Sequence, residues 1–250
     1  MIQKAWYHIG RLISILLARS IFELSIHWKS PFPAKPFILA ANHPSTIDPI
    51  IITTLLQERI SVLIHGKLFR IPLVGRSLRY CGHIPVVYGS GQIALDEAHE
   101  ILKSGHSVAI FPEGEISPEG GFHEPHSGIA RLALCSGAPV VPIGIQLDQK
   151  QLRRKITHVD GENMVAAWYA HGPYAMTIGT SLLFSGDVDD RTLVRQISGQ
   201  VMRLIISLSH ESAQRVRAYN RMSWRMAFLW WLQSPLRLIR SLHAFSVQKI

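Results

Sequence analysis

The sequence is short of cysteine and of long apolar runs. Its 2 cysteines, Cys81 and Cys135, are too few for a disulfide framework, and we interpret both as buried thiols of a reducing compartment. The longest candidates for a spanning segment, residues 13–18 and 227–232, fall far below the roughly 20 residues that span a bilayer. Because 47% of the residues are nonetheless apolar, the composition favours a peripheral membrane protein over a spanning one.

Acidic residues are also scarce. The chain has 17 Asp and Glu against 26 Lys and Arg, a net charge of +9, so nucleic acid and anionic lipid are its candidate partners. No stretch resembles a nucleic-acid-reading motif, and cations gather beside tryptophans near both ends of the chain. We therefore expect peripheral contact with the cytoplasmic face of a membrane, and no nucleic-acid partner.

The two ends of the chain are the candidate membrane contacts. Residues 1–29 have the spacing of a helix with an apolar face, formed by Ile9, Leu12, Ile13, Leu16 and Leu17. Such a helix suits the membrane interface, although a packing helix with a solvated basic face has the same pattern. Residues 211–250 combine arginines with tryptophans, which favours a membrane-surface helix over one that packs on the domain or on a second subunit.

Residues 30–210 predict a single α/β domain. Prolines 31, 33 and 36 end the first helix, and beyond them strand patterns alternate with helix patterns. Because the strands are apolar throughout, we expect a mixed, mostly parallel sheet with helices over its faces. The predicted strands are residues 37–41, 61–65, 83–87, 108–111 and 140–145, with one more strand or hairpin at 173–184. The predicted helices are 49–56, 68–80, 93–103, 128–136 and 192–208, and 146–171 form a basic surface insertion.

A histidine and an aspartate lie at the corner between the first of these strands and the helix that follows it. They are His43 and Asp48 of the stretch Asn42–Asp48. If the corner folds back on itself, the imidazole could accept a proton while the carboxylate orients the ring. This spacing also arises by chance, and Asp48 could instead cap the helix.

A second polar stretch, Phe111–Ser117, follows another buried strand. The carboxyl ends of such strands are where open α/β sheets place their sites. There Glu113 could bind a polar group of a substrate, and Gly114 would let a backbone approach closely. A strand followed by a plain turn is the alternative.

Together these stretches resemble the glycerolipid acyltransferase family, which includes lysophosphatidic acid acyltransferases. Four of the family's blocks occur in order within residues 36–146. They are Asn42–Asp48, Gly66–Gly75 running on to Gly82–Val86, Phe111–Gly114 with Ser117, and Val140–Ile143. The resemblance implies transfer of an acyl group from acyl-CoA or acyl carrier protein to a lipid hydroxyl, with no metal or other cofactor.

The resemblance also implies roles for the positions that match the pattern. His43 would deprotonate the acceptor hydroxyl and Asp48 would orient His43. The residues expected to bind or shape the substrate site are Asn42, Ser45, Gly75, Glu113, Gly114, Glu115 and Ser117. The competing interpretation is a catalytically silent lipid-binding or scaffold protein with the same fold.

This chain departs from the family pattern where the family binds the acceptor phosphate. Tyr88 and Ile116 stand in place of two arginines, Glu115 adds a negative charge, and His126 replaces a lysine. Arginine forks are well suited to phosphate, so we expect an acceptor that lacks a terminal phosphomonoester.

Overall fold

The structure, a computed structural model that describes residues 2–159 and 162–221, is built on a seven-stranded sheet of order β1-β9-β6-β2-β5-β3-β4. Its strands are β1 (Phe22–Trp28), β2 (Ile38–Ala41), β3 (Ile60–His65), β4 (Ile84–Val86), β5 (Ser107–Ile110), β6 (Val140–Leu147) and β9 (Gly172–Ile178). Every neighbouring pair is parallel except β6 and β9. The predicted mixed, mostly parallel sheet is therefore confirmed.

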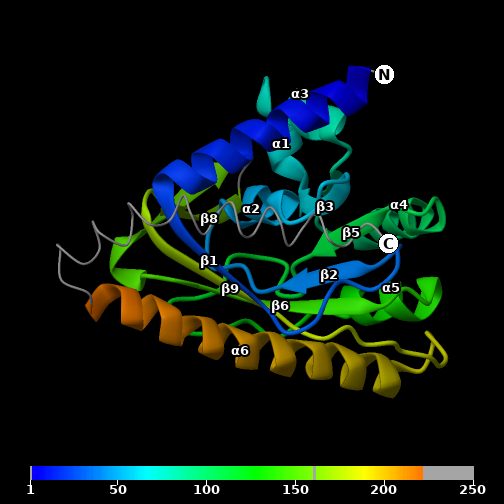
Figure 1. Cartoon of the computed structure of the whole chain (residues 1–250). Helices are drawn as coiled ribbons and strands as arrows, with labels where there is room; N and C mark the ends of the chain where they lie inside the picture. The colour runs from blue at the N-terminus through cyan, green and yellow to red at the C-terminus, as the bar shows by residue number, and fades with distance from the viewer. Residues whose placement is uncertain (1, 160–161, 222–250) are drawn as a thin grey trace.

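Helices cover both faces of this sheet (Figure 1). One face carries α1 (Ile2–Ile21), α2 (Asp48–Thr54), the 3-10 turn η1 (Gly66–Arg70) and α3 (Val74–Cys81), and the other carries α4 (Gly91–Lys103), α5 (Gly128–Ser136) and α6 (Arg191–Arg221). Both faces of strand β2 are buried, which explains why its residues are all apolar. Leu39 and Ala41 pack into the core under α2, whereas Ile38 and Ala40 pack into the core under α5 and α6.

Residues 22–28 correct the prediction of one helix over residues 1–29. They form the edge strand β1, which pairs in parallel with β9. Its apolar residues Phe22, Leu24, Ile26 and Trp28 recur every second position and pack on the core beneath α1. This period of two belongs to a strand, and it outweighs the continuation of the helical pattern.

The predicted helix over residues 68–80 is interrupted. Turn η1 ends at Arg70, and α3 begins at Val74. Between them Pro72 has no N–H to donate, and Ile71 before it is extended with ψ 122. Gly75 lets α3 lie close to η1, since a Cβ there would come 2.0 Å from the Phe69 carbonyl oxygen.

Three other expectations concern the two cysteines, the boundary at residue 210 and the C-terminal helix. Cys81 is half-buried and Cys135 is exposed, so the prediction of two buried thiols is wrong. Helix α6 runs on to Arg221, across the expected segment boundary at residue 210. The predicted membrane-surface helix falls mostly on residues 222–250, outside the described residues.

The insertion at residues 146–171 forms a hairpin of its own. Strands β7 (Leu152–Val159) and β8 (Glu162–Tyr169) pair in antiparallel register as a separate two-stranded sheet. The hairpin joins the domain at the loop after β2. There the Thr46 N–H donates to the Ala167 carbonyl at 2.9 Å, and the Ala167 N–H donates to Thr46 Oγ1 at 3.0 Å.

Candidate active site

The two polar stretches meet at one edge of the sheet. Strands β2 and β5 are parallel neighbours, so the loops that follow them leave the sheet side by side. The Ser117 N–H donates to the His43 carbonyl oxygen at 2.8 Å and joins the two loops. The sheet topology thus assembles the site that the two sequence blocks predicted separately.

His43 and Asp48 form a hydrogen-bonded pair. His43 Nδ1 lies 2.9 Å from Asp48 Oδ2, and the His43 side chain is 15% exposed while that of Asp48 is fully buried. The His43 ring stacks on Phe111 with ring centroids 4.1 Å apart. Because a carboxylate can only accept, Nδ1 carries the proton and Nε2 is left with the lone pair that a general base needs.

Asp48 does not cap helix α2, of which it is the first residue. Its carboxylate turns back to the loop before it. The Ser45 N–H donates to Oδ2 at 2.7 Å, and the Ser45 hydroxyl donates to Oδ1 at 2.7 Å. Asp48 therefore does not act as a helix cap.

Tyr174 completes the surroundings of Asp48. Its hydroxyl donates to Asp48 Oδ1 at 2.7 Å from the buried strand β9. Burial, reinforced by the Asp48 charge, raises the pKa of Tyr174 well above its ordinary value, so the phenol keeps the proton that it donates. Sequence reasoning missed this residue, because Tyr174 lies 126 positions from Asp48 and resembles any aromatic residue of a core strand.

Glu113 is buried and accepts hydrogen bonds from both loops. It is 1% exposed, and its carboxylate accepts from the His43 N–H at 3.1 Å, the Ser117 hydroxyl at 2.6 Å and the His123 N–H at 2.8 Å. A buried carboxylate with three donors from the protein positions the loop that carries His43. Its oxygens are not at the surface.

The side chains of three more predicted binding residues also form hydrogen bonds within the protein. The Asn42 amide exchanges hydrogen bonds with the backbone of Ile145, at 2.9 and 2.7 Å. Ser45 is bound to Asp48 and Ser117 to Glu113, and all three are buried. Their polar side chains hold the loops after β2 and β5 in shape, and Gly75 allows α3 to pack closely on η1.

Gly114 and Glu115 lie at the surface of the same loop. Gly114 has φ 75, and a Cβ there would come 2.7 Å from the His126 ring, so glycine is required on both counts. The Glu115 side chain is 64% exposed and lies 3.7 Å from His123 Nε2. Among the predicted binding residues, Glu115 presents a charge to solvent beside the His43 loop.

The positions that depart from the family pattern carry no cation. Tyr88 is 90% exposed, and the Ile116 carbonyl accepts from His123 Nε2 at 3.2 Å. Residues 112–127, which border the dyad, contain four glutamates and neither lysine nor arginine. In a chain of net charge +9, this loop is locally acidic.

The chain is similar to known acyltransferases. The model of a family described as acyltransferase matches residues 23–146. The 1-acyl-sn-glycerol-3-phosphate acyltransferase of Pseudomonas aeruginosa is 30% identical over 115 residues, 44% of each chain. The chloroplastic enzyme LPAT1 of Arabidopsis thaliana is 28% identical over 148 residues, 56% of this chain and 41% of that one. The chain thus covers less than half the length of these relatives.

A solved structure supports the fold. The 1-acyl-sn-glycerophosphate acyltransferase PlsC of Thermotoga maritima superposes with a TM-score of 0.54 and 22% identity, over 81% of this chain and 79% of that one. The ordered sequence blocks, the family match and the shared fold agree. Residues 23–146 thus match the acyltransferase family, and the chain is similar to the glycerolipid acyltransferases named above.

Proposed function

We propose that the protein is an O-acyltransferase that moves an acyl group from acyl-CoA or acyl carrier protein to the hydroxyl of a lysolipid. The observation that carries this proposal is the His43–Asp48 pair, whose Nδ1–Oδ2 hydrogen bond of 2.9 Å leaves Nε2 available as a base. A silent lipid-binding protein would have no use for a fully buried aspartate held by four donors behind a partly exposed histidine.

The mechanism needs one base and no covalent enzyme intermediate. His43 Nε2 takes the proton of the acceptor hydroxyl as its oxygen attacks the thioester carbonyl. The tetrahedral intermediate then collapses, the carbon–sulfur bond breaks, and the leaving thiolate takes the proton from His43. The Asp48 carboxylate stabilises the imidazolium that exists between these two steps.

The acceptor that fits this site is one without a phosphomonoester beside the hydroxyl. The support is the acidic loop 112–127, in which Glu115 lies exposed and Ile116 occupies an arginine position of the family. A doubly charged phosphate next to this loop would meet repulsion and no fork of N–H donors. The relatives named above carry 1-acyl-sn-glycerol 3-phosphate in their names, and that acceptor is the competing candidate.

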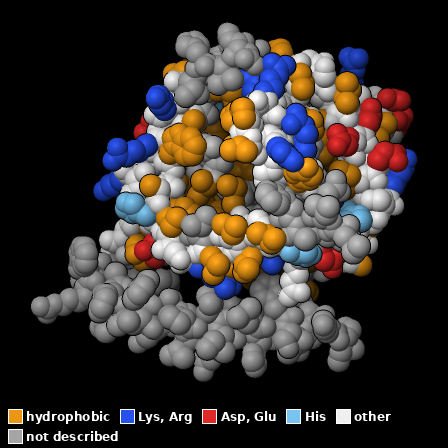
Figure 2. Space-filling model, turned by 90° about the horizontal axis from the view of Figure 1, so that it is seen from above, with side chains coloured by type: hydrophobic (Ala, Val, Ile, Leu, Met, Phe, Trp, Pro, Cys, Tyr) orange, Lys and Arg blue, Asp and Glu red, His pale blue; other side chains and the backbone are white. Residues whose placement is uncertain are grey.

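Helix α1 supports a peripheral membrane location. Tyr7 and Ala18 bury one side of the helix on the domain, while Ile9, Leu12 and Leu16 are each 56% exposed. Figure 2 looks onto the side of the molecule that carries α1 and shows apolar side chains across the middle of this face, with lysine and arginine side chains among them. This composition suits the anionic lipids of a cytoplasmic leaflet.

The described residues contain no helix both long enough and apolar enough to cross a bilayer.

Removing the base tests the mechanism. His43→Ala should lower kcat about 10²- to 10⁴-fold, the contribution of a positioned general base. Asp48→Asn should lower it within the same range, because an amide no longer fixes the tautomer. Acyl transfer is measured with purified protein, labelled acyl-CoA and a panel of lysolipids. Sedimentation with liposomes should stay unchanged in His43→Ala, and full activity of that variant would contradict the proposed role of His43. Absence of acyl transfer by the unmodified protein would support the silent scaffold.

Tyr174→Phe tests the third support of the site. The fold should survive, and kcat should fall about tenfold, equivalent to about 1.4 kcal/mol. Without the phenol, Asp48 Oδ1 keeps only the hydrogen bond from the Ser45 hydroxyl, so the carboxylate that orients His43 is held less firmly. The loss is measured as kcat with acyl-CoA and a lysolipid.

Tyr169→Phe is the matched control. Tyr169 is buried, packs on Phe22 as Tyr174 does, and donates to the Pro173 carbonyl at 2.8 Å instead of to Asp48. Its kcat should match that of the unmodified protein. Equal losses of kcat in both variants would show a general loss of packing rather than an effect on the dyad.

Competition between acceptors tests the specificity. Offered lysophosphatidic acid and a monoacylglycerol at equal concentration, the protein should acylate the neutral acceptor at least as fast. Ile116→Arg should lower the KM for lysophosphatidic acid about tenfold, because it adds a guanidinium fork beside the loop. A strong preference of the unmodified protein for the phosphomonoester would contradict the proposed acceptor class.

Charging the stripe on α1 tests the membrane contact. Leu12→Glu with Leu16→Glu should reduce binding to liposomes with anionic lipid by at least tenfold, because both side chains lose their apolar contact. Ile93→Glu is the control, since Ile93 is 69% exposed on α4. Equal binding of all three proteins in a sedimentation assay would place the membrane contact elsewhere.

A further inference from the structure

A basic groove follows β4, the edge strand of the sheet. Its volume is about 550 Å³, and it extends from Gly82 and His83 before β4 to Gly66 and Val87 at the other end of that strand. Three arginines line it, Arg59, Arg70 and Arg79, against one carboxylate, Glu97. The groove is not part of the dyad or of the acidic loop.

Two of these arginines are held in place without an ion-pair partner. The Arg59 guanidinium rests on Gly82, where an added Cβ would come 1.1 Å from Nη2. The Arg79 guanidinium lies over the Phe69 ring, 5.8 Å from its centroid. Within residues 2–159 and 162–221, no carboxylate lies within 4.0 Å of either group. Two positioned guanidinium groups are thus free to bind an anion.

His83 adds a neutral donor to the same groove. Its Nδ1 accepts from the Val62 N–H at 3.2 Å, so the ring proton is on Nε2. Burial, aided by the positive charge of Arg59, lowers the pKa of His83 to about 4, and the ring is neutral at physiological pH. Guanidinium forks with a fixed N–H donor suit phosphate oxygens.

The groove reaches the edge of the sheet that holds the dyad. Gly66 directly follows β3, whose carboxyl end faces the same edge as those of β2 and β5. In the order β2-β5-β3-β4, three strand spacings separate β4 from the strand before His43, about 14 Å. A thioester donor has this layout, because its reacting carbonyl and its phosphates lie at opposite ends of an extended pantetheine arm.

We propose that Arg59 and Arg79 bind the phosphates of the acyl thioester donor, with the pantetheine arm lying along β4 toward His43. This inference rests on the proposed acyltransferase function and specifies how its donor is held. Coenzyme A and an acyl carrier protein both carry a phosphate at the end of pantetheine, and that phosphate is the shared chemistry.

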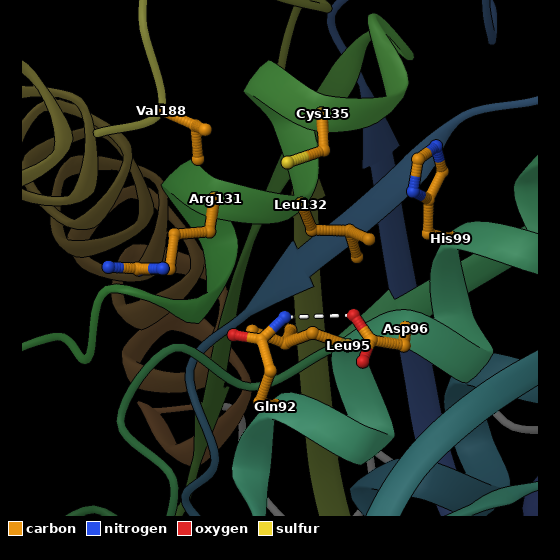
Figure 3. Close-up of a pocket in the computed structure, with 8 residues that line it drawn as sticks. All are labelled: Gln92, Leu95, Asp96, His99, Arg131, Leu132, Cys135 and Val188. Atoms are coloured by element: carbon orange, nitrogen blue, oxygen red, sulfur yellow. Dashed lines mark hydrogen bonds between the residues drawn. The ribbon is translucent and has the colours of Figure 1, made fainter. Parts of the chain in front are cut away.

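A second hollow offers the matched control. It lies between α4 and α5, has a volume of about 240 Å³, and is lined by Arg131 with Asp96 across from it (Figure 3). Asp96 there accepts a hydrogen bond from Gln92 at 2.8 Å. Because this hollow has a single arginine for its acidic group and is not lined by Gly66, Arg131→Gln reports the general effect of removing a pocket arginine.

The test compares donors that differ only in their phosphates. For the unmodified protein, acyl-CoA should show a lower KM than the same acyl group on pantetheine without phosphate. Arg59→Gln and Arg79→Gln should each raise the KM for acyl-CoA about tenfold at nearly constant kcat, and should leave the KM for acyl-pantetheine unchanged. An equal rise with acyl carrier protein assigns the groove to the shared phosphate, whereas a rise with acyl-CoA alone assigns it to the nucleotide phosphates.

Calorimetric titration with coenzyme A separates failure of this inference from failure of the proposed function. Binding should be lost in the variant with both Arg59→Gln and Arg79→Gln and retained in Arg131→Gln, at matched thermal unfolding temperatures. If no donor is turned over but coenzyme A still binds through these arginines, the groove is correct and the function is wrong. If acyl-CoA is turned over with the same KM in all variants, the groove proposal is overturned and the function stands.

Discussion

The site depends on one buried negative charge. Asp48 is fully buried, and an ionised carboxylate in such a place is costly unless donors surround it. Four donors do so, namely the His43 imidazole, the Ser45 N–H, the Ser45 hydroxyl and the Tyr174 hydroxyl. Satisfying this charge therefore fixes the loop, the position of β9 and the tautomer of His43 together.

The same constraint explains why the site uses more of the chain than its sequence blocks. The match to the family model ends at residue 146, yet Tyr174 supports Asp48 from β9, and Ala167 of the hairpin pairs with Thr46. Glu113 makes a second buried carboxylate with three donors between the two loops. Both acidic groups act from within the protein, so the exposed edge of His43 is left to meet the substrates.

Sequence reasoning succeeded where the signal was local. The apolar runs of β2, β5 and β6 and the helix α5 lie between clear turn residues, and the spacing of His43 and Asp48 identified the dyad. It failed where partners are distant along the chain. The alternation in Phe22–Trp28 indicates a strand only once its pairing with β9 is known, and nothing in Tyr174 itself distinguishes a phenol that binds the buried Asp48 from a core aromatic residue. Glu113 was expected to face the substrate because a short motif does not say which way a carboxylate points.

The charges around the dyad are separated in a way that bears on both substrates. Residues 112–127 beside His43 carry four glutamates and neither lysine nor arginine, whereas Arg59 and Arg79 lie in the groove along β4. Under the proposed function, a donor phosphate bound by the guanidinium groups is thereby held away from the reacting carbonyl, as a thioester donor requires. An acceptor with its own phosphomonoester would need the opposite arrangement, with cations next to the hydroxyl that the proposed base deprotonates. The proposed donor groove and the proposed acceptor class therefore agree with one distribution of charge, which suits a charged donor and a neutral acceptor.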